Sequence, residues 1–139
     1  AAQCLQGSRA FLAKSMTIKT LLENRGDEHH IFPKKYLENN QFIQKEYNQV
    51  ANYVFTEQST NIKIKDLAPE VYFEKIKNQI AENNIALGTL DSINDLENNL
   101  KENDIPLTVM QQDFTSYKTF LQQRRQLISQ RIKHYYQNL

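Results

Sequence analysis

Residues 27–33 read Asp-Glu-His-His-Ile-Phe-Pro, and this run decides how the surrounding chain is interpreted. Pro33 disfavours helix at the residue before it and suits the first turn of a helix expected to begin at Lys34. His29 and His30 therefore lie at the end of a probable strand. An imidazole can act as a base near pH 7 without a perturbed pKa, and it is a common metal ligand. The pair indicates a site in which one histidine binds a metal and the other takes a proton from water.

The remaining pattern predicts an α+β chain that is mostly helical. A small core of one short antiparallel strand pair and a helix is flanked by other helices. We expect one domain, 1–139, with an N-terminal helix in 1–25, the core in 26–82 and a C-terminal helical region in 83–139. The expected elements are a helix over 5–24 ended by Asn24-Arg25-Gly26, a short helix over 42–47, a strand over 50–55, helices beginning at Asn61 and Pro69, one capped by Asp91, and one from Asp113 to about Gln137.

Composition limits the class of protein. The 139 residues suit a single domain or part of a larger protein. No apolar run approaches the ~20 residues that span a membrane, so we expect no membrane partner. The single cysteine, Cys4, excludes an internal disulfide and a Cys-rich zinc site. With no secretory signal, this favours the cytoplasm. The chain begins at Ala1 without a methionine, which suggests a fragment or a processed product.

Phosphodiester hydrolysis needs the parts that the histidine run offers. A metal stabilises charge on the phosphoryl and leaving oxygens, while a base deprotonates the attacking water. The amide oxygen of Asn61, with water in other positions, suits Mg²⁺ or Mn²⁺ better than a closed zinc site.

Four segments together resemble a known family. The chain is similar to the HNH, or ββα-metal, endonucleases, and most similar to the HNH domain at the C-terminus of modification-dependent restriction and phage-defence proteins. Such proteins usually carry an upstream nucleotide-hydrolysing domain with a DGQQR-type motif, which is absent here. The resemblance covers roughly residues 20–137 and implies a DNA endonuclease, with RNA as another possible substrate. The segments that carry it are 29–33, 50–55, 60–64 and 68–72, with a similar C-terminal helix at 120–128.

The resemblance implies a role for each matching residue. His29 corresponds to a metal ligand and His30 to the general base. Asn52 corresponds to the asparagine that ties the loop between the strands through backbone hydrogen bonds. Asn61 corresponds to the second metal ligand, at the start of the helix. The insert between the strands, about sixteen residues, is longer than in simple HNH nucleases, which leaves the register of Asn52 open.

Some assignments stay open at this point. Glu28 could replace His29 at the metal. The position of Lys63 is closer to that of the lysine near phosphate in the family motif, whereas Lys65 would share a helical face with Asn61. Further candidate phosphate contacts are Lys34, Arg124, Arg125 and Arg131.

Charge is unevenly distributed toward the C-terminus. Residues 82–113 hold seven acids and one base, and residues 114–139 hold five bases and no acid. Arg124 and Arg131 fall within the apolar arc of the last helix, where a charge needs a partner. An acid of 82–113, Asp27 or Glu28 could supply it, or the arginines could reach a phosphate. Of these two alternatives, a structural ion pair between an arginine and an acid is favoured over contact with a phosphate. Lys118, Arg125 and Lys133 lie elsewhere on this helix and either follow a phosphate backbone or form a solvated face.

Two other functions compete with the nuclease. One is a catalytically silent nucleic-acid-binding or assembly module on the same scaffold. The other is a helical interaction domain in which the histidines hold a structural ion or nothing. His134, on the last helix, fits a solvated or core-edge position.

Overall fold

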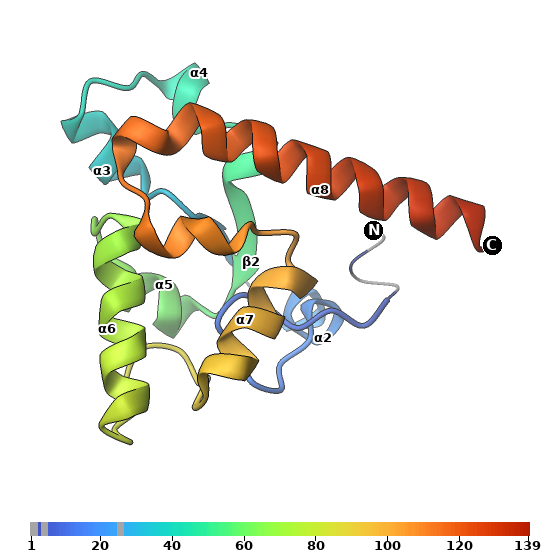
Figure 1. The fold of residues 1–139 in the computed structure, drawn as a ribbon, viewed down its shortest axis with the longest axis horizontal. Helices are drawn as coiled ribbons and strands as arrows, with labels where there is room; N and C mark the ends of the chain where they lie inside the picture. Colours follow the sequence, from blue (N-terminus) through green and yellow to red (C-terminus); the bar gives the residue numbers. More distant parts are fainter. Residues whose placement is uncertain (1–2, 4–5, 25–26) are drawn as a thin grey trace.

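The computed structural model describes residues 3, 6–24 and 27–139, and it shows an α+β chain dominated by helices (Figure 1). Cys4 and the predicted Arg25-Gly26 helix end lie outside the described residues. The elements are, in order, α2 (Ile18–Glu23), β1 (Asp27–His30), α3 (Lys34–Asn39), α4 (Gln44–Tyr47), the 3₁₀ turn η1 (Val50–Asn52), β2 (Tyr53–Thr56), α5 (Gln58–Ile64), α6 (Pro69–Ala81), α7 (Ile93–Glu102), the 3₁₀ turns η2 (Leu107–Gln111) and η3 (Phe114–Ser116), and α8 (Tyr117–Gln137).

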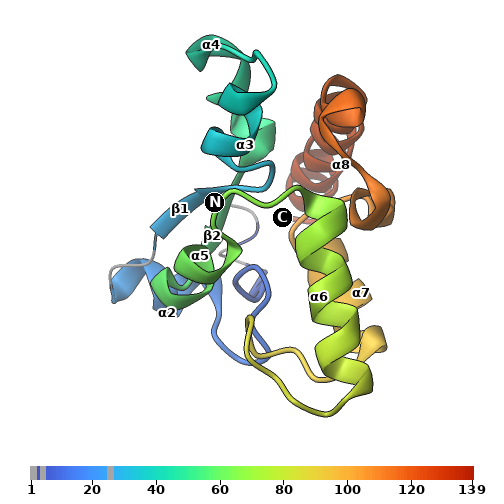
Figure 2. The ribbon, with the colours of Figure 1, turned by 90° about the vertical axis from the view of Figure 1, so that its left-hand side faces the viewer.

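The two strands form the expected antiparallel pair. Asp27 is opposite Thr56, and His30 is opposite Tyr53. Figure 2 shows α3 and α4 on one side of the pair and α5 on the other, so the strand–strand–helix order is also a spatial unit. The predicted strand over 50–55 begins too early, because residues 50–52 form η1. Asn52 therefore precedes the strand, and its backbone oxygen accepts from Ile31 N at 2.8 Å.

The predicted N-terminal helix is wrong over residues 6–17. Of the described residues 6–24, only Ile18–Glu23 is helical, because the preceding segment crosses the interior as a loop. Four consecutive side chains, at positions 10–13, are buried, whereas a helix would bury one face. Its backbone bonds go to distant elements: Phe11 N donates to Phe55 O at 2.9 Å, and Leu12 N donates to the Asn99 side chain at 2.9 Å.

Three other helix boundaries differ from the prediction. Helix α5 begins at Gln58 after Glu57, so Asn61 lies within it and not at its start. Helix α4 begins at Gln44, two residues later than expected. Ser92, not Asp91, caps α7 through a hydrogen bond from Asp95 N. Helix α6 begins at Pro69 as predicted. Asp113 caps the 3₁₀ turn η3, and α8 follows that turn from Tyr117 and ends at Gln137.

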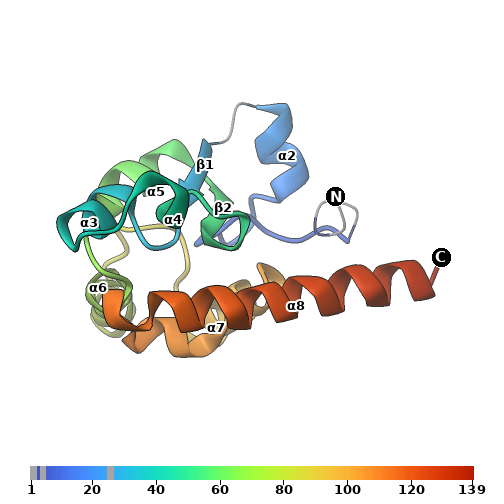
Figure 3. The ribbon, with the colours of Figure 1, turned by 90° about the horizontal axis from the view of Figure 1, so that it is seen from above.

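One main apolar cluster joins both halves of the chain, with residues from Phe11 in the N-terminal loop to Leu121 in α8. Figure 3 shows α8 along one side of the molecule, with its C-terminal half extending past the other elements. Among the described residues, no helix combines the length and the apolar character that a bilayer crossing requires.

Asn99 of α7 holds the N-terminal loop in place. Its Oδ1 accepts from Leu12 N, and its Nδ2 donates to the oxygens of Ala10 and Ala13 at 3.0 and 3.1 Å. Asn99 is fully buried, so its side chain supplies hydrogen bonds to these loop groups where water does not reach. The bonds explain how a loop with an irregular backbone can lie inside the fold.

We expect Asn99→Leu to lower the free energy of unfolding by about 3 kcal/mol, because it leaves buried backbone groups without partners. Asn98→Ala on the exposed side of the same helix is the control and should change stability by less than about 0.5 kcal/mol. Urea unfolding of both variants measures the difference. Equal effects of the two substitutions would contradict the anchoring role of Asn99.

Candidate functional site

The end of β1 and the start of α3 form one side of an open pocket of about 270 Å³. Both histidines reach it, although adjacent strand residues point to opposite faces, because the strand ends there. Asn61 closes the other side from α5. We call this cavity the histidine pocket. Its lining residues are Glu28, His29, His30, Pro33, Lys34, Lys35, Glu38, Asn61 and Lys65.

His30 is half-buried and held from two directions. Its ring lies 4.9 Å from the ring of Tyr53, its partner in the strand register, and 6.0 Å from that of Tyr47. Its Nε2 is 2.9 Å from Asn48 Oδ1. With Asn48 Oδ1 as the acceptor, Nε2 carries the proton and Nδ1 keeps its lone pair. The arrangement thus fixes the tautomer and leaves a ring nitrogen that can accept a proton.

His29 is buried, with 6% of its surface exposed. Burial, and to a lesser extent the charge of His30, lowers the pKa of His29 to about 4. Its Nε2 is enclosed and has no hydrogen-bond partner among the described residues. A buried polar atom without a partner is costly, and a neutral imidazole is the form that binds metals. His29 therefore has the chemistry of a ligand, whereas His30 has that of a base.

The two lysines that were candidates for contacting phosphate lie in different surroundings. Lys63 turns away from the histidine pocket and donates to Ala86 O at 2.7 Å. Lys65 follows the end of α5, has a positive φ of 55°, and lines the pocket. The sequence predicted that Lys65 shares a helical face with Asn61. This is wrong because α5 ends at Ile64, yet both side chains line the same cavity.

Asn52 is completely buried behind the pocket and makes the hydrogen bonds expected of it. Its Oδ1 accepts from Phe32 N at 2.8 Å. Its Nδ2 donates to Phe32 O and Tyr47 O, both at 3.1 Å. One amide thereby joins the segment after His30 to the end of α4, which places Asn48 beside the His30 ring.

The donor set suits a weakly held, hydrated ion. Within the described ranges, no three His, Cys, Asp or Glu side chains are grouped to hold a metal. The available protein donors are one imidazole nitrogen of His29 and the amide oxygen of Asn61, with the exposed Glu28 at the rim. Mg²⁺ keeps several waters and accepts few protein ligands, so this set fits it, or Mn²⁺, better than zinc.

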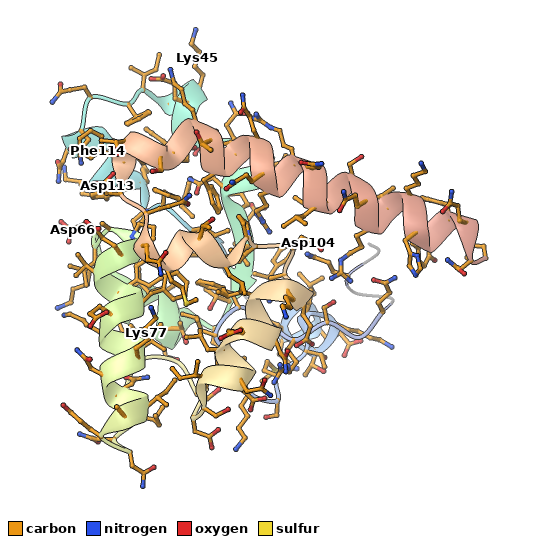
Figure 4. All side chains as sticks on the ribbon, viewed as in Figure 1. Lys45, Asp66, Lys77, Asp104, Asp113 and Phe114 are labelled. Atoms are coloured by element: carbon orange, nitrogen blue, oxygen red, sulfur yellow. The ribbon has the colours of Figure 1, made fainter. Side chains whose placement is uncertain are left out.

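Arg124 and Arg131 lie outside the histidine pocket, so they are not its phosphate contacts. Arg131 Nε lies 2.8 Å from both carboxylate oxygens of Asp104, at the end of α7 beneath α8 (Figure 4). This is the structural pair favoured above. Among the described residues Arg124 has no carboxylate partner; it donates to the oxygens of Ala51, Tyr53 and Asn103. Burial lowers the pKa of Arg124 to about 10. Both arginines line a separate cavity of about 520 Å³ under the C-terminal half of α8.

Comparison with family models, with curated proteins and with solved structures found no match to this chain.

Burial of His29 has a consequence for stability at acid pH. Its pKa in the folded chain, about 4, is below the ordinary histidine value of about 6.5, so the unfolded chain binds a proton more readily. Stability that is fully present above about pH 6.5 should be lost as the pH falls toward 4, by up to about 3 kcal/mol.

Urea unfolding in EDTA between pH 7 and 4 measures this loss for the natural chain and for His29→Gln, which cannot titrate there. We expect a steeper pH dependence in the natural chain. Parallel pH dependences would contradict a buried, neutral His29.

Proposed function

We propose that this chain is a metal-dependent endonuclease domain that hydrolyses phosphodiester bonds, with DNA as the substrate. The observation that carries the proposal is the pairing of two different imidazoles in one pocket. His30 has a ring nitrogen held by Asn48, and His29 has a buried nitrogen without a partner. Two histidines with a purely structural role would not require one oriented ring and one buried nitrogen without a partner.

His30 would act as the general base. A water at the mouth of the histidine pocket could donate a proton to Nδ1 while the ring stays oriented by Asn48 and Tyr53. A positive charge that forms on the ring would be stabilised by the amide oxygen of Asn48. His29, neutral at pH 7 because of its lowered pKa, would add no competing positive charge beside it.

His29 and Asn61 would hold a divalent metal, with Glu28 as an additional or alternative ligand at the rim. When bound, Mg²⁺ or Mn²⁺ supplies charge stabilisation for the phosphoryl and leaving oxygens. Lys65, with Lys34 and Lys35 across the pocket, would attract and orient the phosphate. Glu28 and Glu38 keep the pocket from being uniformly positive.

A role in restriction or phage defence, together with an upstream nucleotide-hydrolysing domain, follows from the family resemblance alone. The alternative is a catalytically silent nucleic-acid-binding module. It is favoured by one observation, namely that the described residues contain no group of three His, Cys, Asp or Glu side chains placed to hold a metal.

We expect His30→Ala to lower the rate of metal-dependent plasmid nicking by about 10²–10⁴-fold, the range for loss of a general base. The variant should remain folded, because the half-buried ring makes one side-chain hydrogen bond. His134→Ala is a matched control, since this histidine lies exposed near the end of α8 and should be dispensable.

Rates are measured with Mg²⁺ and Mn²⁺ and with EDTA, alongside circular dichroism of both variants. Undiminished nicking by folded His30→Ala would exclude the proposed mechanism. An absence of nicking by the natural chain under every divalent ion would favour the silent module.

A further inference from the structure

Four cations lead away from the histidine pocket across α4 to α8. Lys34 lies at the pocket, and its Nζ is 5.7 Å from the ring centre of Tyr47, the last residue of α4. Lys45 projects outward from α4 (Figure 4). Lys118 and Arg125 lie on the adjoining part of α8 and line a shallow hollow of about 300 Å³ together with Lys45. We call Lys34, Lys45, Lys118 and Arg125 the basic strip.

The contacts between α4 and α8 hold this strip in one arrangement. Tyr117 donates its hydroxyl to Glu46 O at 2.6 Å, and Arg125 Nη2 donates to Gln49 Oε1 at 3.0 Å. Gln49 directly follows Asn48, which binds His30. Two adjacent side chains therefore connect the candidate base to Arg125. The two hydrogen bonds and the two linked side chains limit the distance from His30 Nε2 to Arg125 Nη2 to less than about 20 Å.

The strip is positively charged and exposed. All four cations are solvent-exposed, and within residues 6–24 and 27–139 none lies within ion-pair distance of a carboxylate. Glu46 is the one acid in the hollow, and its carboxylate accepts from Ile43 N at 2.9 Å. Clustered cations repel each other, and a polyanion relieves this repulsion.

We propose that the basic strip binds the phosphate backbone of one DNA strand and guides it into the histidine pocket. One strand of duplex DNA carries a phosphate about every 3.4 Å along the axis, so a span of up to about 20 Å along that axis covers at most about six phosphates. The basic C-terminal segment thus has two parts. Arg124 and Arg131 stabilise the fold through hydrogen bonds to the backbone and an ion pair with Asp104. Lys118 and Arg125 face the substrate. This inference rests on the proposed function for its choice of DNA.

The test compares two double variants with equal changes in charge. Lys118→Gln with Arg125→Gln removes two cations of the strip. Lys19→Gln with Lys75→Gln removes two exposed cations elsewhere, on α2 and α6. The dissociation constant for a DNA duplex of about 24 base pairs is measured in EDTA over a range of salt concentrations. Nicking by the natural chain is measured separately with Mg²⁺ and Mn²⁺.

We expect the strip variant to bind more weakly and to reduce the slope of log affinity against log salt by about 1.8, which corresponds to two lost phosphate contacts. The control variant should keep the natural slope. An unchanged slope in the strip variant, or an equal decrease in both, would overturn the inference. If the natural chain nicks DNA while the strip variant keeps its slope, the strip fails and the nuclease proposal stands. If the slope falls but the natural chain never nicks, the strip stands and the nuclease proposal fails.

Discussion

The buried turn at Ala51–Tyr53 is the constraint on which the candidate site depends. From one side, the Asn52 amide binds the backbone of Phe32 and Tyr47. From the other, the Arg124 guanidinium donates to the oxygens of the residues that flank Asn52. The interior supplies a matching partner for each donor and acceptor of the amide, so the turn has one favoured arrangement. The end of β1, the insert after it and α8 are thereby held together, and His30 is placed beside Asn48.

Local chemistry predicted the parts of the fold that are encoded locally. Pro33 and Pro69 mark helix starts because a missing N–H is harmless there, and Asp113 caps the turn that leads into α8. The N-terminal loop could not be predicted, since Phe11, Leu12 and Ile18 also fit a helical spacing. What decides its conformation is long-range: the side chains of Thr56 and Asn99 bind its backbone.

In the histidine pocket, too, local sequence predicted some features, while others depend on long-range contacts. The pairing of His29 with His30 before Pro33 predicted a strand end with two imidazoles in one place. The start of α5 was misplaced because Glu57 caps it without a side-chain hydrogen bond, leaving no sequence signature. No residue pattern indicated Asn48 as the partner of His30, since the long insert brings it back only through the Asn52 bonds. The choice between Lys63 and Lys65 likewise needed the position of Ala86.

The central claim is that adjacent histidines have separate roles, one toward a metal and one toward a proton. Mn²⁺ binding, followed by electron paramagnetic resonance, tests it most directly in the natural chain, His30→Ala and Asn61→Ala. We expect one bound Mn²⁺ per chain in the natural protein and in His30→Ala, and at least a tenfold weaker site, about 1.4 kcal/mol, in Asn61→Ala. Equal binding by all three proteins, or loss of Mn²⁺ in His30→Ala alone, would contradict it.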